Sequence, residues 1–555
     1  MRMFHLGWSR PLGGSFALFP ARALPILAGI LTAALLAACT PRETPVARGD
    51  REQILHRGIG HDLADLDPAL ATQSSDYSVL SALFEGLVGE DPVDLHPVPA
   101  VAESWDISPD HIVYTFHLRK DALWSNNDPV TAQDFVASWQ RALSPELAAD
   151  YASFLFVIQG AEAYSKKLTP FSQVGLTAPD AHTLRVTLDH PCPYFLSLLT
   201  LPVFYPVNLH AIEAFGSATS RSTPWSRPDR LVGNGPFDLI AWHTGQEIVV
   251  RKSYTYWDHA TVTLREIHFH GIDSLDVEER AFRAGQLHVT DALPPSKLDT
   301  YRNEAPSVLR IDPLLGTYFY RLNTSRSILG DARIRRALSL AVDRDAIAEK
   351  ILRGGQLPAR SLVPPGTAGY TSAAQLATDP DAARKLLAEA GYPGGKGLPP
   401  FELLFNNSES HRLVAEAVQE MWHRELGIDV RLLNQDRKST LDARRAGSYQ
   451  IMRDVWIADF VDPASFLDIF ASDSGNNYTG WKNADYDTAL FAAARETDPA
   501  ARRALYQKAE AILLDAAPII PIYHYAHVFL VQPSVKGWNP TLLDHHPYKY
   551  VRLEP

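Results

Sequence analysis

The chain has 555 residues, of which 46% are hydrophobic, so it can bury a large core, and its length favours more than one domain. Its formal net charge of -12 is spread along the sequence without a long acidic tract, which favours solubility and gives no reason to expect a nucleic-acid partner. The 40 prolines and 32 glycines are dispersed, so we expect loops inside folded domains and no long linker.

The N-terminus has the pattern of an export signal. Three arginines precede an uncharged run over residues 23–38, which is near the lower limit for crossing a bilayer as a helix. The run ends in Leu36-Ala37-Ala38-Cys39, and polar residues follow at once. This resembles a bacterial lipoprotein signal, which implies that residues 1–38 are removed and that Cys39 carries a lipid outside the cytoplasmic membrane. An ordinary signal peptide, or an N-terminal membrane anchor with an incidental cysteine, is the alternative.

The two cysteines have different contexts. If Cys39 carries the lipid, no internal disulfide can form, and Cys192, which lies between two prolines, is predicted to be a lone buried thiol. Residues 39–51 are predicted to form a flexible tether, with ordered structure beginning at residue 52.

Local patterns then predict helices and strands in alternation. Residues 77–87 have apolar side chains at helical spacing, and residues 111–119 alternate in the manner of a strand. A turn over 124–130 follows. Thr131, with an acid three residues later, predicts a capped helix that continues through Trp139.

Two later helices have strong start signals. Asp379-Pro380 and Asp498-Pro499 each place a capping acid before a proline that suits the first helical position. Gly391 is expected to end the first helix, and Pro518 follows the second. The alternation of strands and helices predicts α/β lobes, and we find no internal repeat.

Three motifs are similar to those of one family, the solute-binding proteins of peptide ABC importers, in its oligopeptide-binding branch. They are Ala100-Val101-Ala102-Glu103-Ser104-Trp105, Tyr114-Thr115-Phe116-His117-Leu118-Arg119 and Trp124-Ser125-Asn126-Asn127-Asp128-Pro129-Val130-Thr131. The family's usual Asp-Gly in the turn is Asn126-Asn127 here, and asparagine tolerates the left-handed backbone angles that such a turn needs. The similarity extends from about residue 52 almost continuously to the C-terminus.

The resemblance implies an α/β fold of two lobes with an extra subdomain, the periplasmic-binding-protein fold, in which the ligand is enclosed between the lobes. The implied boundaries are residues 52–85, 206–312 and 525–555 for a discontinuous lobe 1, 86–205 for the extra subdomain, and 313–524 for lobe 2.

The segment 449–467 places one arginine, one tryptophan and three acids in an apolar, strand-like run. Arg453 and Asp459 are six residues apart, so in an extended chain they would project from one face, about 20 Å apart at roughly 3.3 Å per residue. A peptide is a zwitterion, and its charged ends need an acid and a base when they are buried. The sequence therefore predicts a frame for the two ends of a peptide.

By resemblance, Asp459 is the aspartate that binds the α-ammonium of a peptide, and Trp456 and Ile457 beside it line a side-chain pocket. Arg453, Arg444 and His411 match three positions that meet the peptide carboxylate at different peptide lengths. A surface aspartate and solvated charges on a helix or strand are the alternatives.

Other positions follow from the same resemblance or depart from it. Thr72 and Ser74 align with the strand that pairs with the peptide backbone. Arg437 replaces a tryptophan of enterobacterial members, and if it faces a pocket, an acidic ligand residue would be favoured. The cysteine pair that staples the cleft in some relatives is replaced by Gly316 and Ile457.

Other residues depart from the family pattern or suggest a different kind of site. Asp291 and Ala292 stand where enterobacterial members place asparagines. The glycine-rich run 391–397 lacks the spacing of a phosphate loop and is predicted to be a helix stop and a turn. His268 and His270 would share a strand face, but a third and fourth metal ligand are not evident, so we expect no metal and no cofactor.

The sequence thus predicts a lipid-anchored, extracytoplasmic binding protein that captures short peptides and delivers them to the permease subunits of an ABC importer. We expect a monomer that reaches the membrane through Cys39 and is not an enzyme. Another cargo on the same scaffold, such as murein peptide, a nickel complex or haem, is the nearer alternative. A hydrolase is the remote one, because no nucleophile or metal motif of that class is present.

Overall fold

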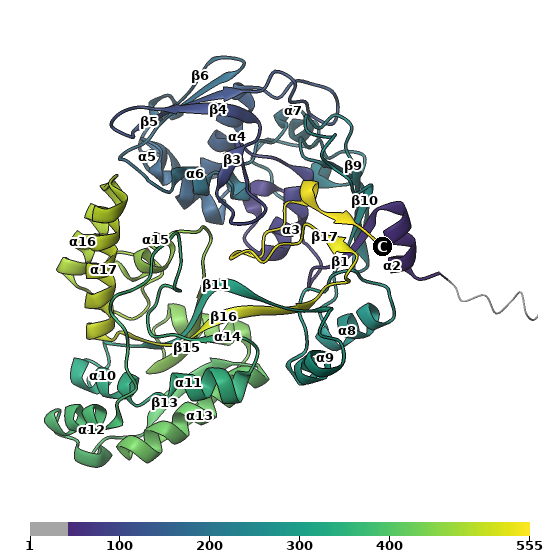
Figure 1. The fold of residues 1–555 in the computed structure, drawn as a ribbon. Helices are drawn as coiled ribbons and strands as arrows, with labels where there is room; N and C mark the ends of the chain where they lie inside the picture. Colours follow the sequence, from purple (N-terminus) through teal and green to yellow (C-terminus); the bar gives the residue numbers. More distant parts are fainter. Residues whose placement is uncertain (1–42) are drawn as a thin grey trace, which may run out of the picture. The chain divides into compact units, whose positions relative to one another are not determined.

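The computed structural model describes residues 43–555, so the predicted signal peptide over 1–38 and the predicted lipidation site Cys39 lie outside the described residues (Figure 1). The chain divides at Thr44 into two units, and every element below lies in the unit Pro45–Pro555. None of the helices in the described part is both long enough and apolar enough to span a bilayer.

The predicted tether over 39–51 is wrong in its second half, because α2 (Pro45–Glu52) is a helix. Proline suits the first position of a helix. The backbone N–H of Val46 donates to the carbonyl oxygen of Gly285 (3.0 Å), and Gly49 is buried. Packing against a distant part of the chain orders this segment, and composition alone does not reveal such packing.

The first sheet joins segments that are far apart in the sequence. In the order given next, the first two strands pair in parallel, and each of the two remaining neighbouring pairs is antiparallel. The order is β1 (Ile54–Gly58), β10 (Glu266–His270), β9 (Glu247–Lys252) and β8 (Phe237–His243). One hydrophobic core joins residues within 55–84, 205–289 and 529–553, including α3 (Ser74–Leu83). The helix predicted over 77–87 is thus confirmed but begins and ends earlier.

A second four-stranded sheet, entirely antiparallel, lies within residues 102–187. Its order is β4 (Ala102–Ile107), β5 (Val113–Leu118), β7 (Thr183–Thr187) and β6 (Leu176–Asp180). The predicted capped helix is α4 (Ala132–Leu143), with Thr131 and Asp134 forming a reciprocal capping box. In the preceding turn Asn127 has φ 70°, the left-handed conformation that the asparagine was expected to tolerate.

The third sheet has six strands and a different core on each face. The order is β12 (Leu357–Pro358), β16 (Ile519–Leu530), β11 (Leu309–Leu322), β15 (Ile451–Ile457), β13 (Phe401–Asn406) and β14 (Val430–Gln435). Tyr318 and Tyr320 of β11 pack in a core with α10 (Ala332–Leu340), α12 (Pro380–Glu389) and α13 (Glu409–Leu426). Phe319 packs in the other core, with α15 (Ala464–Leu467), α16 (Ala484–Arg495) and α17 (Pro499–Ala516), which also includes the second sheet.

The long antiparallel strands β11 and β16 connect the first and third sheets, and Figure 1 shows them running side by side. Their pairing shifts register between Pro313 and Thr317. Just past the end of β16, Val531 bridges to Val289, which in turn bridges to Arg57 of β1. A bulge disrupts regular pairing and bends a strand, so this pair contains a local irregularity between two regular sheets.

The helix starts predicted from Asp-Pro pairs are confirmed. Asp379 caps α12 and Asp498 caps α17, each accepting from a backbone N–H, and each helix has proline at its first turn. α12 ends at Glu389 and Gly391 has φ 97°, so the glycine-rich run is a helix stop and a turn. The other short elements are β2 (Val88–Glu90), β3 (Pro97–Pro99), α5 (Ala161–Ser165), α6 (Phe195–Leu198), α7 (Leu209–Glu213), α8 (Leu275–Arg283), α9 (Leu298–Glu304), α11 (Arg344–Ala346), α14 (Arg437–Arg445), β17 (Val535–Lys536) and β18 (Arg552–Leu553).

Candidate functional site

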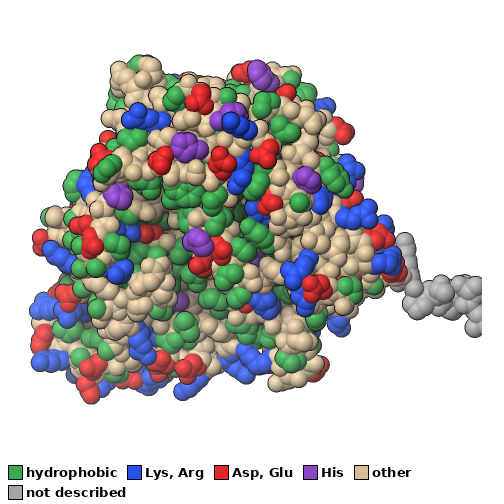
Figure 2. Space-filling view, turned by 45° about the horizontal axis from the view of Figure 1, so that its top comes forward, with side chains coloured by type: hydrophobic (Ala, Val, Ile, Leu, Met, Phe, Trp, Pro, Cys, Tyr) green, Lys and Arg blue, Asp and Glu red, His purple; other side chains and the backbone are tan. Residues whose placement is uncertain are grey.

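A pocket of about 480 Å³ lies where the second sheet's subdomain meets the α15 side of the third sheet. One wall comes from the 3₁₀ helix η2 (Asp150–Val157) and from Tyr194, and the other comes from the end of β15 through α15 to η9 (Asp468–Phe470). Figure 2 shows this side of the molecule hollowed across its middle, with hydrophobic side chains inside the hollow and charged ones around it. A ligand bound in such a hollow has most of its surface removed from water.

Asp459 projects into this pocket just beyond β15. Its Oδ1 accepts a hydrogen bond from the Tyr151 hydroxyl (3.1 Å), and that hydroxyl also reaches the carbonyl oxygen of Thr72 (3.4 Å). Burial raises the pKa of Asp459 to about 6, against the opposing effect of the Tyr151 hydrogen bond. Among the described residues, no arginine, lysine or histidine lines the pocket. The carboxylate is therefore held in place without a basic side chain to neutralise it.

Arg453 and Asp459 do not share one extended face. β15 ends at Ile457, so the regular alternation on which the six-residue spacing was based stops before Asp459. Within the strand, Arg453 is paired in register with Tyr320 of β11. Its guanidinium lies 4.9 Å from the ring of Tyr318, so it faces the core that contains both tyrosines. The expectation of a common face is wrong because the chain turns after the strand.

Two of the three predicted carboxylate partners lie together. Arg453 donates to Asn406 Oδ1 (3.2 Å) and to the Tyr525 hydroxyl (2.8 Å), while its Nε has no partner in the described part of the chain. His411, at the start of α13, lies 3.2 Å from the carbonyl oxygen of Asn406 through its Nδ1. Burial, with the nearby charge of Arg453, lowers the pKa of His411 to about 4, so this imidazole is neutral at neutral pH.

Arg444 has a different environment. It pairs with Asp454 (3.1 Å), which also accepts from Arg321 (2.8 Å) and lies on the opposite face of β15 from Arg453. The Arg444 guanidinium also lies 4.9 Å from the ring of Tyr478. The structure thus brings Arg453 and His411 together and engages Arg444 with an internal carboxylate.

The predicted pocket residues are distributed over several surfaces. Trp456 lines the pocket beside Asp459, and its Nε1 has no hydrogen-bond partner among the residues described. Ile457 is 40% exposed and pairs in register with Gly316, where a Cβ would meet the Ile457 Cδ1 atom at 2.3 Å. Arg437 is exposed at the first position of α14 and does not line the pocket.

The prediction that Thr72 and Ser74 lie on a strand is wrong. Thr72 is in the loop before α3, and Ser74 is the first residue of that helix. Gln73 and Asp76 form a reciprocal capping box, and Asp76 also accepts from the N–H of Thr72 (3.0 Å). This local capping favours a helix start over an extended strand. Both residues are exposed.

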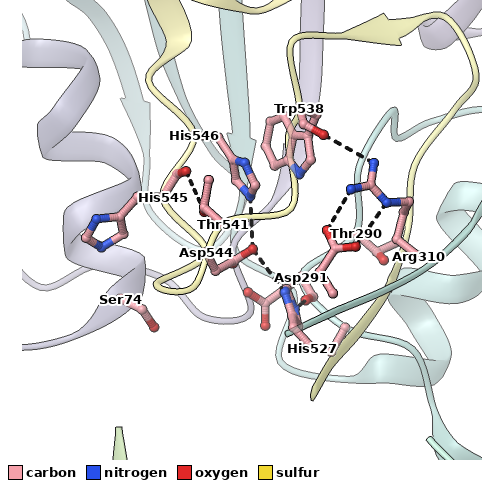
Figure 3. Close-up of polar contacts among 12 residues, drawn as sticks. Ser74, Thr290, Asp291, Arg310, His527, Trp538, Thr541, Asp544, His545 and His546 are labelled. Atoms are coloured by element: carbon pink, nitrogen blue, oxygen red, sulfur yellow. Dashed lines mark hydrogen bonds and ion pairs between the residues drawn. The ribbon is translucent and has the colours of Figure 1, made fainter. Parts of the chain in front are cut away.

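A polar network that sequence reasoning missed ties the C-terminal segment to β16 (Figure 3). Asp544 pairs with His527 Nδ1 (3.0 Å) and His546 Nε2 (2.9 Å), and His527 Nε2 contacts the carbonyl oxygen of Asp291 (2.5 Å). Burial opposes the charge on His527, but Asp544 and this carbonyl raise its pKa to about 9. His545 instead contacts Glu90 (2.9 Å), so the adjacent histidines serve different carboxylates.

His268 and His270 do share a strand face and meet a third histidine, His56, whose Nδ1 lies 3.2 Å from His270 Nε2. The Nδ1 atom of His268 lies 2.9 Å from a carboxylate oxygen of Glu247, with which it pairs. Burial and the neighbouring histidines lower the pKa of His56 to about 2. In the part of the chain that the structure describes, one group of three residues converges closely enough to share an ion: Asp91, Asp94 and His96, at the surface.

The prediction that Cys192 is a lone buried thiol is confirmed. The side chain is 1% exposed and free, and burial raises the pKa of the thiol to about 12. A thiol in this environment is inert as a nucleophile.

The chain was compared with known proteins. Residues 96–478 match the family described as "Bacterial extracellular solute-binding proteins, family 5 Middle". The periplasmic oligopeptide-binding protein OppA of Escherichia coli (strain K12) is 38% identical over 533 residues, which are 93% of this chain and 95% of that protein. The solved structure of the Escherichia coli murein tripeptide-binding protein MppA has a TM-score of 0.77 at 35% identity and covers 90% of this chain and 98% of its own. Haemophilus influenzae OppA, solved in complex with RPPGFSPFR, has a TM-score of 0.76 at 33% identity, with coverages of 90% and 99%.

Proposed function

This chain belongs to the bacterial extracellular solute-binding proteins of family 5 and has their two-lobed α/β fold, and on that premise we propose that it captures short peptides in the periplasm for an ABC importer. One observation carries the choice of cargo: Asp459 is a half-buried carboxylate in an aromatic pocket that no basic side chain lines, among the residues described. A buried anion needs a cation, and the α-ammonium of a peptide supplies one. The OppA relatives are named as oligopeptide-binding proteins, which supports this cargo.

The peptide carboxylate is assigned to Arg453. Its guanidinium is held by Asn406 and Tyr525 and keeps one N–H without a partner in the described part of the chain. His411 beside it is neutral at neutral pH and contributes a hydrogen bond and no charge. Arg444 is a weaker candidate because Asp454 already neutralises it.

Capture proceeds by closure of the two lobes. Asp459 follows the third sheet, whereas Tyr151, which donates to it, belongs to the subdomain of the second sheet. A ligand that contacts both walls of the pocket stabilises the arrangement that brings them together. The long strands that connect the lobes shift register between Pro313 and Thr317 and again between Tyr318 and Phe319, and such irregularities are where a strand pair bends.

The anchor is proposed from the sequence. Cys39 after Leu36-Ala37-Ala38 is the lipidation site, and the folded unit follows a few residues later, at Pro45. A lipid attached to Cys39 would keep the protein near its permease at the membrane. Metabolic labelling with a palmitate analogue should mark the wild-type chain and leave Cys39→Ser unlabelled, and equal labelling would contradict the anchor.

Murein peptide is the second candidate cargo. The relative MppA, named as a murein tripeptide-binding protein, matches this chain at a TM-score of 0.77. A released murein tripeptide also carries an α-ammonium, so Asp459 can serve either cargo. Binding measurements separate the two cargoes.

The test is titration calorimetry of the purified protein with Ala-Ala-Ala, N-acetyl-Ala-Ala-Ala and murein tripeptide, with mass spectrometry of the recovered ligand. The proposal predicts that the free tripeptide binds and is recovered intact, and that acetylation weakens it by about 30-fold or more, since a buried charge pair is lost. Equal binding of the acetylated peptide, or binding of the murein tripeptide alone, would contradict it. Recovery of cleaved peptide would support the hydrolase alternative.

A further inference from the structure

A second carboxylate, Asp468, opens into the same pocket as Asp459. It is the first residue of η9, and its side chain is exposed to the space that the pocket encloses. In the part of the chain that the structure describes, its carboxylate makes no hydrogen bond or ion pair. Its backbone N–H donates to the carbonyl oxygen of Ala464, and its backbone carbonyl accepts from the N–H of Ala471 (3.2 Å). Asp468 is therefore an acid in a pocket without a partner of its own.

The nearest basic residue is committed elsewhere. Arg502 forks onto both oxygens of Asp462, at 2.8 Å each, and also donates to the Tyr506 hydroxyl (2.7 Å). Asp462 additionally accepts from the N–H of Ala464. Burial, with the nearby charge of Asp462, raises the pKa of Asp468 to about 7 despite Arg502. The protein thus neutralises Asp462 by an arginine and leaves Asp468 to a proton or to a cation from outside.

The walls around the two carboxylates suit a long, flexible, positively charged side chain. Aromatic rings dominate them: Tyr151, Phe154, Tyr194, Trp456 and Phe460. The Tyr194 and Phe460 rings are stacked, with centroids 4.9 Å apart. Aromatic faces attract cations and pack well against the methylene stems of lysine and arginine. The remaining polar lining is uncharged at Ser153, Ser465, Ser474 and Asn476, and Asp150 at the start of η2 adds a third carboxylate at the pocket's edge.

A ligand α-ammonium can neutralise Asp459, which leaves the exposed carboxylate of Asp468 across the pocket. An apolar first side chain would cover that carboxylate without giving it a partner, which costs free energy or requires protonation. A basic first side chain supplies a second cation within the same residue of the ligand. The pocket therefore discriminates by charge as well as by shape.

We propose that this pocket selects peptides whose first residue is lysine or arginine, with the α-ammonium at Asp459 and the side-chain cation at Asp468. The inference rests on the proposed function and adds to it the chemical class of the first ligand residue. Asp468 is in this account a specificity-determining residue, and Asp459 is the anchor common to all peptides.

The test compares Lys-Ala-Ala with norleucine-Ala-Ala, which has an apolar chain of similar length, by titration calorimetry at pH 8. The wild type is expected to bind the lysine peptide about tenfold more tightly or better. Asp468→Asn keeps the shape of the side chain and removes its charge, so the ratio of the two dissociation constants should fall to within about threefold of unity. Asp473→Asn removes an exposed acid outside the pocket and should keep the wild-type ratio.

The outcomes separate the two proposals. If the wild type binds both peptides equally, and acetylation still weakens binding of the tripeptide by about 30-fold or more, the inference is overturned and peptide capture stands. If Asp468→Asn retains the preference for lysine, Asp468 is not its source and the inference is overturned. If neither peptide binds the wild type, both proposals fail. The wild-type comparison needs no variant, so it decides the preference even if Asp468→Asn does not fold.

Discussion

The buried cluster around Asp454 offers a quantitative test of how the third sheet is stabilised. Asp454 accepts from Arg321 (2.8 Å), from Arg444 (3.1 Å) and from the N–H of Val455 (2.9 Å). Arg321 is 2% exposed, so it cannot turn to solvent when its partner is lost. Asp454→Asn preserves shape and removes the charge, and breaking a buried pair in this way costs about 3 to 5 kcal/mol.

Arg444→Gln is the matched control. The Arg444 side chain is 23% exposed, and Asp454 keeps Arg321 when Arg444 is lost, so we expect a cost of about 1 kcal/mol. The free energy of unfolding is measured from urea titrations followed by tryptophan fluorescence. If Asp454→Asn costs less than Arg444→Gln, the assignment of Asp454 as the partner of a buried arginine is refuted.

The same variant also tests the site. If Arg444→Gln weakens tripeptide binding more than Arg453→Gln does, Arg444 is the partner of the peptide carboxylate.

Two further predictions concern pH and the backbone. Asp459 has a pKa raised to about 6, and only its ionised form attracts an ammonium, so the affinity for Ala-Ala-Ala should be full above about pH 7 and fall by about tenfold per unit below pH 6. Calorimetry from pH 8 to pH 5 checks this, and a flat profile would contradict it. Asn127 has φ 70°, so Asn127→Val should cost about 1 to 2 kcal/mol of unfolding free energy and Asn127→Gly less than about 0.5 kcal/mol, and equal losses would refute a steric origin.

Features set by neighbouring residues could be predicted from the sequence. The helix starts at Thr131, Asp379 and Asp498 are confirmed because a capping side chain and the N–H it satisfies lie within three residues. The left-handed turn at Asn127 is local in the same way. The family resemblance supplied the two-lobed fold, which contact between distant segments creates and periodicity alone does not specify.

Features set by distant partners could not be predicted. Arg444 looked like a free cation on a helix, but its partner Asp454 lies on a strand and is shared with Arg321. α2 is ordered by contact with Gly285, more than 200 residues away in the sequence. Asp468 could not be assigned to the pocket from the sequence, because three of the aromatic side chains that line it, Tyr151, Phe154 and Tyr194, come from a segment about 300 residues earlier.

The pairing of Asp459 with a peptide ammonium is the central claim, and the affinity of Asp459→Asn for Ala-Ala-Ala tests it most directly. Titration calorimetry at pH 8 compares this variant with the wild type and with Asp473→Asn, and circular dichroism checks that all three are folded. Because the ammonium loses its charged partner in a buried pocket, the dissociation constant should rise by about 30-fold or more, equivalent to at least about 2 kcal/mol, while Asp473→Asn stays at the wild-type value. A dissociation constant for Asp459→Asn within about threefold of the wild type would contradict the account.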